Sequence, residues 1–293
     1  VFSSVFIQDE IKINPQLILV AGLRYDRFDI GVEDQIEIAN GADDQNNGLL
    51  ARVDTEVSPR LGAIYKPSED LSFYLSLSRS FLPRSGDQFL NLSLSTQALA
   101  PEEFENREVG LKWNINDNLS FTTALFEVRR ENGTASDPAN PEKSLVLGTK
   151  TKGFELQLVG YVTDKWQINA GYSQLDAQET GRVVSNTVDN RTLGQIPETM
   201  FTLWNRYQLS DKWAFGLGMI YQAEQFTSLN NNVELPDFTR VDAAVYYNLS
   251  DKTKIQFNLE NLFDEEYFPA AHNDNNISTG EPINARVSVT YQF

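Results

Sequence analysis

Cysteine is absent from this 293-residue chain, histidine occurs once, and no long apolar run is present. Without cysteine the chain can form neither a disulfide nor a thiolate metal site. A membrane-spanning helix needs about 18 consecutive apolar residues, so their lack excludes a helical membrane protein. Basic residues are also in deficit, with 24 against 41 acidic ones. The net charge of −17 repels phosphate and argues against nucleic acid as a partner.

What the sequence does have is alternation, seen most clearly in the carboxy-terminal stretch RVSVTYQF (286–293). In an extended strand, a period of two puts polar and apolar side chains on opposite faces. The polar face carries Arg286, Ser288, Thr290 and Gln292, and the apolar face carries Ala285, Val287, Val289, Tyr291 and Phe293. Such a strand suits a wall between lipid and water, or a half-exposed sheet in a soluble protein.

Short turn signals recur along the chain between runs with this period, at 14–16, 67–70, 116–118, 163–165, 210–212 and 250–252. Long polar segments lie at the other ends of the runs, at 31–50, 131–147, 177–197, 227–236 and 264–282. Outer-membrane barrels have short turns at one end and long loops at the other. A propeller needs four short strands in each repeat, which these long runs do not match. The asymmetry therefore favours a transmembrane barrel.

The periodic runs predict thirteen strands, at 2–13, 17–30, 52–66, 70–82, 104–115, 118–130, 148–162, 166–176, 198–209, 213–226, 237–249, 253–262 and 283–293. An antiparallel barrel with an odd number of strands would have to pair its first and last strands in parallel. Bacterial single-chain barrels have even numbers of strands. Residues 1–293 are therefore expected to be the carboxy-terminal portion of a larger barrel. Alone, they would leave two strand edges unpaired and form no closed monomer in lipid.

The face opposite the apolar one carries ionised groups of both signs along the whole chain. These predicted inward residues are Arg24, Arg60, Glu108, Lys112, Glu155, Arg206, Arg240, Asp242, Glu260 and Arg286. A dry barrel core could not hold so many charges without a severe desolvation cost. The interior is therefore either wet or filled by another protein element. On the outside, Tyr65, Trp113, Trp166, Trp213 and Phe293 fall near the short turns, where an aromatic girdle belongs.

An ordered series of motifs resembles the TonB-dependent outer-membrane receptors. Asn261-Leu262-Phe263-Asp264, then Tyr267, a loop and a last strand ending in Phe293 resemble the carboxy-terminus of that family. The series also includes FIQDEIKINPQLILVAGLRYDRF (6–28), SPRLGAIYKPSEDLSFYLSLSRSFLP (58–83), ENREVGLKW (105–113), TKGFELQL (151–158), LPDFTRVDAAVYY (235–247) and AHNDNNIS (271–278). These motifs are most similar to the ferric-siderophore branch. One departure is Ile283 after Pro282, where the family often has arginine.

The resemblance implies an all-β fold, an antiparallel barrel of about 22 strands whose lumen holds an amino-terminal plug. This chain would supply the last thirteen strands, without the plug. The implied function is TonB-energised import of a ferric siderophore, of catecholate type on the strength of AHNDNNIS. No covalent chemistry and no resident cofactor are implied, since iron arrives inside the siderophore. The implied partners are the siderophore, the TonB system through the plug, outer-membrane lipid and lipopolysaccharide, and the barrel assembly machinery.

Other functions remain as alternatives. A receptor of this family could instead carry cobalamin, haem or a glycan, and a complete unplugged barrel could be a passive porin. A barrel hydrolase needs a histidine with serine or aspartate partners in the wall. The single histidine, His272, lies in a predicted loop, so the enzyme hypothesis is rejected.

Arginine and aromatic side chains near the long loops suit an anionic, partly aromatic ferric chelate. The ligand-binding candidates are Arg79, Phe81, Arg84, Arg129, Arg130, Tyr172, Tyr221, Phe226, Tyr267, Phe268 and His272. The lumen-facing or plug-facing candidates are Arg60, Glu108, Lys112, Arg206, Arg240, Asp242, Glu260 and Arg286, and the assembly signal is Tyr291 with Phe293. Loop packing, interface anchoring and solvated pairing are the structural alternatives for each set.

Two further segments have local predictions. Asn261 to Asp264 is expected to end a strand and turn the chain through Asn and Asp side-chain hydrogen bonds. The acidic segment 31–50 carries Glu33, Asp34, Glu37, Asp43 and Asp44. It is interpreted as a solvated charge run, with divalent cations beside lipopolysaccharide as the alternative.

Overall fold

Within the computed structural model, the described residues are all but 34, 41–48, 85–98, 138–139 and 183–190. Thirteen strands of the described chain form one antiparallel sheet in sequence order, so the predicted number of strands is confirmed. They are β1 Phe2–Lys12, β2 Leu17–Glu33, β3 Leu49–Tyr65, β4 Leu71–Leu82, β5 Glu102–Asn116, β6 Leu119–Asp137, β7 Asn140–Thr163, β8 Trp166–Arg182, β9 Thr199–Gln208, β10 Trp213–Gln222, β13 Phe238–Ser250, β14 Thr253–Glu260 and β17 Asn284–Tyr291. The all-β prediction holds apart from a short helix, α1 Gln35–Asn40.

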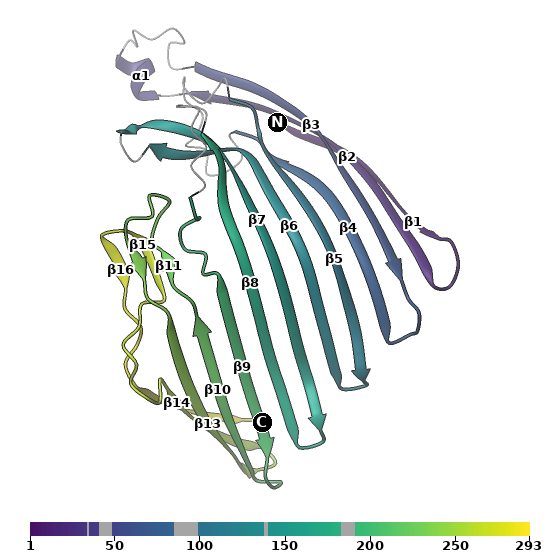
Figure 1. Ribbon diagram of the computed structural model, residues 1–293, viewed down its shortest axis with the longest axis vertical. Coiled ribbons are helices and arrows are strands. Elements are labelled where there is room, and N and C mark those ends of the chain that lie inside the picture. The colour runs from purple at the N-terminus through teal and green to yellow at the C-terminus, as the bar shows by residue number, and fades with distance from the viewer. Residues whose placement is uncertain (34, 41–48, 85–98, 138–139, 183–190) are drawn as a thin grey trace.

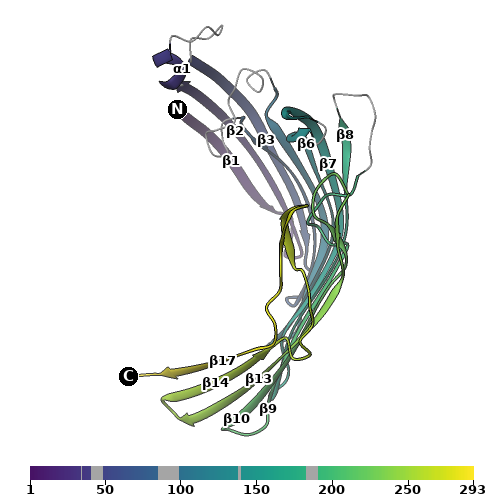
Figure 2. The same ribbon diagram turned by 90° about the vertical axis from the view of Figure 1, so that its left-hand side faces the viewer.

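The sheet curves into an open trough with a concave and a convex side (Figures 1 and 2). β1 and β17 are its two edge strands and do not pair with each other. The short turns lie together at the lower end in Figure 1, and the long connections lie at the upper end. The predicted asymmetry of the hairpins is therefore present in the fold.

Side-chain hydrogen bonds to the backbone close the short turns. The Asn14 carboxamide oxygen accepts from the backbone N–H groups of Gln16 (2.9 Å) and Leu17 (2.8 Å). Asn116 accepts in the same way from Asn118 (2.8 Å). Asn, Asp, Ser and Thr favour turns because their side chains can make these local bonds. The sequence signals at these positions thus act through identifiable contacts.

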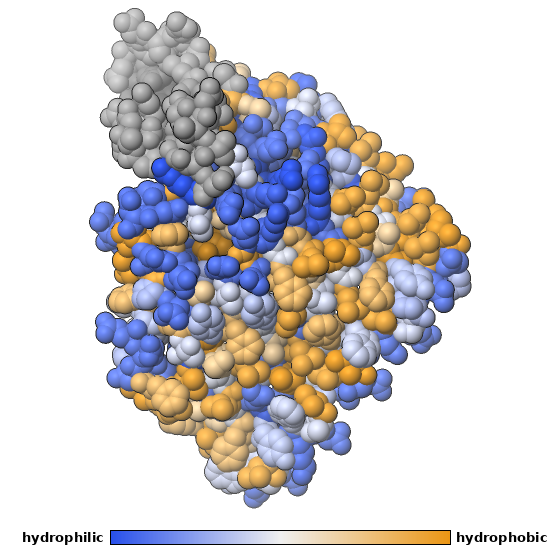
Figure 3. Space-filling model, in the orientation of Figure 1, coloured by the Kyte–Doolittle hydropathy of each residue, from blue (hydrophilic) through white to orange (hydrophobic). Residues whose placement is uncertain are grey.

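Apolar side chains form rows on the convex face. Val287 and Val289 of β17 are 63% and 64% exposed, and Val289 pairs with Ile255 of β14. Further along the sheet Leu75 pairs with Val109, which pairs with Leu125. Figure 3, which shows the convex side, is largely apolar over its lower part and hydrophilic higher up, below the grey atoms. So large an exposed apolar surface fits a wall that faces hydrocarbon.

The aromatic residues predicted to form a girdle are exposed near the short-turn ends of their strands. Tyr65, Trp113, Trp166, Trp213 and Phe293 are all exposed side chains at these positions. The Trp213 ring also packs on the Tyr247 ring of β13, with centroids 4.4 Å apart. In the described residues, no helix is long and apolar enough to cross a membrane.

The predictions for the long-loop end need correction. Much of segment 131–147 is strand rather than loop, because β6 continues to Asp137 and β7 begins at Asn140. Similarly, β2 and β3 extend into segment 31–50, which also contains α1, and β8 runs into segment 177–197. The hydrogen-bond ladder of an antiparallel pair joins backbone groups, so it can continue past the apolar band into polar sequence.

Of the acidic residues in 31–50, Asp34, Asp43 and Asp44 lie outside the described residues.

Two small hairpins stand apart from the main sheet. β10 ends at Gln222 rather than at 226, and the next two residues of strand, β11 Gln225–Phe226, pair with β12 Glu234–Leu235. Segment 264–282, predicted as loop, contains β15 Ala270–Asn273 paired with β16 Asn276–Ser278. His272 therefore lies in a strand, exposed, and not in an irregular loop.

Candidate functional site

The concave face carries the charged residues that the alternation assigns to the inside. Each of the eight lumen or plug candidates has the parity opposite to the apolar row of its own strand, so all lie on this face: Arg60, Glu108, Lys112, Arg206, Arg240, Asp242, Glu260 and Arg286. Arg240 pairs with Asp242 (2.8 Å), and Arg286 lies 3.7 Å from Glu260. The concave side of the sheet therefore carries charges of both signs.

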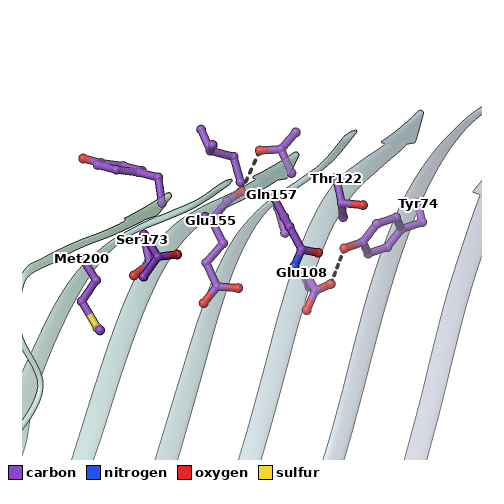
Figure 4. Close-up of a pocket in the computed structure, with 13 residues that line it drawn as sticks. Tyr74, Glu108, Thr122, Glu155, Gln157, Ser173 and Met200 are labelled. Atoms are coloured by element: carbon purple, nitrogen blue, oxygen red, sulfur yellow. Dashed lines mark hydrogen bonds between the residues drawn. The ribbon is translucent and has the colours of Figure 1, made fainter. Parts of the chain in front are cut away.

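A shallow hollow on this face spans β4 to β9 (Figure 4). Most of its lining residues are of polar types, and the lining includes Tyr74, Glu108, Thr122, Glu155, Gln157, Ser173 and Met200. The Tyr74 hydroxyl donates to Glu108 Oε1 (2.5 Å), and Lys112 Nζ lies 5.5 Å from the centroid of the Tyr74 ring. A Cβ added at Gly110 would lie 2.5 Å from that ring, so glycine lets the tyrosine lie flat on the wall. The hollow therefore presents hydrogen-bonding groups beside apolar surface.

Trp204 of β9 also lies on the concave face and was not predicted from the sequence. Its ring covers β10, where a Cβ at Gly216 or Gly218 would come within 2.6 or 2.4 Å of the indole. Two glycines at i and i+2 in a strand signal a close approach by another group, so the pattern GLG (216–218) was the available clue. Next to it, the Arg206 guanidinium lies 5.0 Å from the Tyr246 ring centroid.

A group of charged side chains lies at the long-loop end of β4, β5 and β6. Arg84 follows β4 and is buried, with 6% of its surface exposed, and burial lowers its pKa. Arg84 Nη1 is 3.6 Å from Glu102 Oε1, and Arg130 Nη2 is 2.6 Å from Glu102 Oε2. Both predicted arginines thus meet on a glutamate that the sequence did not single out. The contact between Glu102 and Arg84 could not be predicted from local sequence, because the whole connection between β4 and β5 separates the two residues in the chain.

Four predicted ligand contacts lie on the convex face instead. Arg79 has the parity of Leu75 and Leu77, and Arg129 that of Leu125; Tyr221 has that of Phe215 and Leu217. Tyr172 also borders the concave hollow, but it pairs with Leu156, and its side chain has the parity opposite to that of Ser173. The placement of these four argues against contact with a ligand in the lumen. Side-chain parity within each strand was enough to predict this.

The remaining candidates occupy varied positions. The Phe81 ring meets the Phe28 ring edge-on at 5.5 Å, past the last pair that joins β3 to β4. Phe226 belongs to β11, Phe268 is half-buried, and His272 is exposed. Tyr267 is buried against the Phe238 ring (4.6 Å) and accepts a hydrogen bond from Arg240 Nη1 (3.0 Å). Its contacts therefore join the last long connection to the wall.

The predicted turn at Asn261 to Asp264 is confirmed in detail. Both residues have left-handed backbones, with φ of 54° and 53°. The buried Asn261 carboxamide donates to the carbonyls of Glu265 (2.8 Å) and Glu281 (3.1 Å) and accepts from the Glu265 N–H (2.9 Å). Asp264 Oδ1 accepts from the Ile283 N–H (2.8 Å). Asparagine and aspartate tolerate this backbone and supply the bonds that both ends of the connection need.

Three long connections are tied together around segment 227–232. Asp274, in the β15–β16 turn, accepts from the side chains of Thr227 (2.6 Å), Ser228 (2.7 Å) and Asn230 (2.7 Å). These bonds to the charged form lower the pKa of Asp274. On the other side, the Asn231 carboxamide donates to the Thr192 carbonyl (2.8 Å) and accepts from its N–H (3.1 Å). The connections before β9, β13 and β17 thus pack as one unit.

The sequence and the fold both match a known family. The family model described as TonB dependent receptor-like, beta-barrel, matches residues 2–262. The probable TonB-dependent siderophore receptor PiuA of Acinetobacter baumannii is 29% identical over 308 residues, covering 99% of this chain and 40% of PiuA. The crystal structure of the siderophore receptor PiuA superposes with a TM-score of 0.83 at 28% identity, covering 99% of this chain and 43% of that one.

Two other relatives are named for different cargoes. The metal-pseudopaline receptor CntO of Pseudomonas aeruginosa is 27% identical, over 98% of this chain and 40% of its own length. The catecholate siderophore receptor Fiu of Escherichia coli is 29% identical, over 74% of this chain and 31% of its own length. The chain thus spans about 40% of the length of its first relatives and corresponds to the carboxy-terminal part of their barrels. With its two-faced antiparallel wall and a family model matched over most of its length, the chain belongs to the TonB-dependent receptor β-barrel family.

Proposed function

We propose that the receptor containing this chain imports a ferric siderophore across the outer membrane in a TonB-dependent way. Homologues of this family are outer-membrane transport receptors, and the relatives PiuA and Fiu are named as siderophore receptors. The observation that carries the proposal is the division of the wall into an apolar convex face and a charged, hydrogen-bonding concave face. This division suits a barrel with lipid outside and a hydrated or protein-filled lumen.

The wall's chemistry supports a role in holding a plug. A protein element in the lumen would meet both signs of charge on the concave face. Glu108 and Glu155 line the hollow, Lys112 lies on the same strand as Glu108, and Arg60 lies on β3. Such polar contacts can be exchanged for contacts with water at small net cost. A plug held by such polar contacts could rearrange when the TonB system pulls on it, whereas a plug held by apolar contacts would resist that movement.

The test is uptake of radiolabelled ferric siderophore by iron-limited cells. Deleting the full-length gene should abolish uptake of one siderophore, and the intact gene should restore it. A matched strain without a working TonB system should show the same loss, since the proposed import is energised. Unchanged uptake of every ferric siderophore supplied, after deletion, would contradict the proposal.

The second candidate is TonB-dependent uptake of another cargo. One observation favours keeping it, because a relative of similar identity is named for a metal-pseudopaline complex. Cobalamin, haem and glycans belong to the same alternative. To separate these cargoes, the deletion strain is grown with each cargo as the only source of the nutrient that the cargo supplies. The strain should fail to grow only on the cargo that the receptor imports.

A passive porin and an enzyme are the functions we propose against. The family consists of transport receptors, and the proposed import needs neither covalent chemistry nor a resident cofactor. The iron is cargo inside the chelate. Conductance of the full-length protein in planar bilayers checks the porin alternative, for which a steady open channel would be expected without TonB.

Three surface partners complete the proposal. The convex apolar rows would contact outer-membrane lipid, and the charged side chains above them would lie at the level of lipopolysaccharide. Arg129 belongs to this upper convex group, where it pairs with Glu127 (2.8 Å), and Glu127 also pairs with Lys150 (3.2 Å). At the other end, Tyr291 and Phe293 pack edge-on at 5.1 Å. We propose that this exposed aromatic pair is read by the barrel assembly machinery.

A further inference from the structure

Arg84 and Arg130 share one carboxylate but differ in how their guanidinium groups are used. The Arg84 side chain is only 4% exposed. Its Nε donates to the Ala100 carbonyl (2.6 Å), and its Nη2 donates to the carbonyl of Asn132. Together with the 3.6 Å approach to Glu102, these contacts occupy all sides of the Arg84 guanidinium. Arg84 is therefore a structural cation that fixes the position of Glu102.

Arg130 is held firmly and yet remains accessible. Its Nε and Nη2 both reach Glu102 Oε2, at 2.8 and 2.6 Å. Its guanidinium carbon lies 5.7 Å from the centroid of the Phe104 ring, and Arg130 pairs with Phe104 across β5 and β6. The side chain is nevertheless 38% exposed. Among the described residues, Arg130 Nη1 has no hydrogen-bond acceptor. The guanidinium is therefore fixed on the side of Glu102 and Phe104 and open on its Nη1 side.

The charge around this group favours an anion. Two guanidiniums share the single carboxylate of Glu102, which leaves one positive charge in excess. The group lies on the concave face, since Arg130 and Phe104 have the opposite parity to the convex Arg129 and Leu125. It also lies at the long-loop end of the wall, where an incoming solute arrives first.

We propose that Arg130, stacked on Phe104 and oriented by Glu102 and Arg84, is an anion-binding subsite for negatively charged ferric chelates at the outer end of the lumen. This inference rests on the proposed function and adds the class of chelate and the residue that contacts it. A guanidinium held in one orientation loses little conformational freedom when it binds, and it donates charge-assisted hydrogen bonds to catecholate or carboxylate oxygens. The adjoining Phe104 ring offers an aromatic surface to a flat chelator.

The test compares two ferric complexes on the full-length receptor. Ferric tris(2,3-dihydroxybenzoate) is an anion, and ferric tris(acetohydroxamate) is neutral. Equilibrium dialysis with radiolabelled iron measures the binding of both. Arg130→Gln should weaken binding of the anionic complex at least about tenfold, equivalent to about 1.4 kcal/mol, and leave binding of the neutral complex unchanged.

The matched control is Arg107→Gln on the next strand. It removes the same charge from the convex face, where Arg107 pairs with Glu105 (3.3 Å). The anionic complex should bind this variant as it binds the unaltered receptor. Arg130→Lys keeps the ion pair and the fold but lacks the planar guanidinium, so it should give a smaller loss on the anionic complex alone. Heat-modifiable migration verifies that each variant is folded.

The outcomes separate the two proposals. If the unaltered receptor binds the anionic complex and both Arg130 variants bind it equally well, the subsite is refuted and the import proposal stands. Equal losses on the neutral complex, or the same loss in Arg107→Gln, would also refute the subsite. If the unaltered receptor binds and transports no ferric chelate, both proposals fall together.

Discussion

Asn261 should be the residue on which the last long connection depends most. It is 1% exposed, and its side chain makes three hydrogen bonds to the backbone of Glu265 and Glu281. Replacing it with alanine leaves those three groups without partners, at about 1 kcal/mol each. Alanine also tolerates the left-handed backbone less well, by about 1 kcal/mol. The expected cost of Asn261→Ala is therefore about 4 kcal/mol.

Two further variants divide this cost between its causes. Asn261→Gly loses the same hydrogen bonds but accepts a φ of 54° freely, so it should be about 1 kcal/mol milder than alanine. Asn261→Asp keeps an acceptor for the Glu265 N–H but loses both donated bonds and faces two carbonyls with a carboxylate. Aspartate should therefore destabilise at least as much as glycine, although it has nearly the same shape as asparagine.

The assay is hydrogen exchange of the Leu262 amide in the full-length receptor. This N–H donates to the Val241 carbonyl (2.7 Å), a bond that none of the substitutions removes, so its exchange reports local opening. A cost of about 4 kcal/mol corresponds to exchange roughly a thousandfold faster. The Leu209 amide in the β9–β10 turn, bonded to the Trp213 carbonyl (2.9 Å), serves as the unaffected control. Equal exchange rates in the alanine and glycine variants would refute the predicted cost of the left-handed backbone. A wild-type exchange rate in Asn261→Asp would refute the predicted importance of the two donated hydrogen bonds.

Three other expectations follow from the same contacts. Hydrogen bonds from Thr227, Asn230 and Ser228 lower the pKa of Asp274. The stability that these bonds give the folded hairpin is therefore fully present above the ordinary aspartate pKa of about 4, and it is lost as pH falls through the lower pKa of the folded state. Pepsin should therefore cut the β15–β16 hairpin increasingly below about pH 4, while Asp274→Asn should be cut readily throughout and lack that step. Leu125→Arg on the convex face should lower the unfolding free energy in vesicles by about 2–4 kcal/mol, against little change for Leu125→Phe, and equal stability of the two would count against lipid contact there. Gly110→Val should displace the Tyr74 ring and cost about 1–3 kcal/mol in the same assay, an expectation that an unchanged midpoint would contradict.

The strands and their two faces follow from local sequence. A period of two repeats along nearly every strand, so the number of strands and the inward position of residues such as Arg240 and Glu260 could be read without knowing the fold. The turn at Asn261 could also be predicted, because two of its side-chain bonds reach Glu265, four residues away, although the bond to Glu281 spans the whole connection. Parity would have assigned Arg79 and Tyr221 to the outside as well, and they were chosen instead for chemistry and nearness to the loops. The strand ends at the long-loop side were misjudged because the backbone ladder continues where apolar residues stop.

What only the tertiary structure decided is which distant side chains meet. Asp274 is 47 residues from Thr227 in the chain, and Arg84 finds Glu102 across an intervening connection. Nothing in the local pattern marks these pairs, because polar loop residues have no periodicity and each could equally be solvated. The two adjacent arginines show the same division. Their alternation required that Arg129 and Arg130 face opposite sides, but only the packing of β5 against β6 set Arg130 on Phe104 and gave it Glu102 as a support. A strand's faces depend on its own residues, whereas a site depends on the neighbours that the sheet brings beside it.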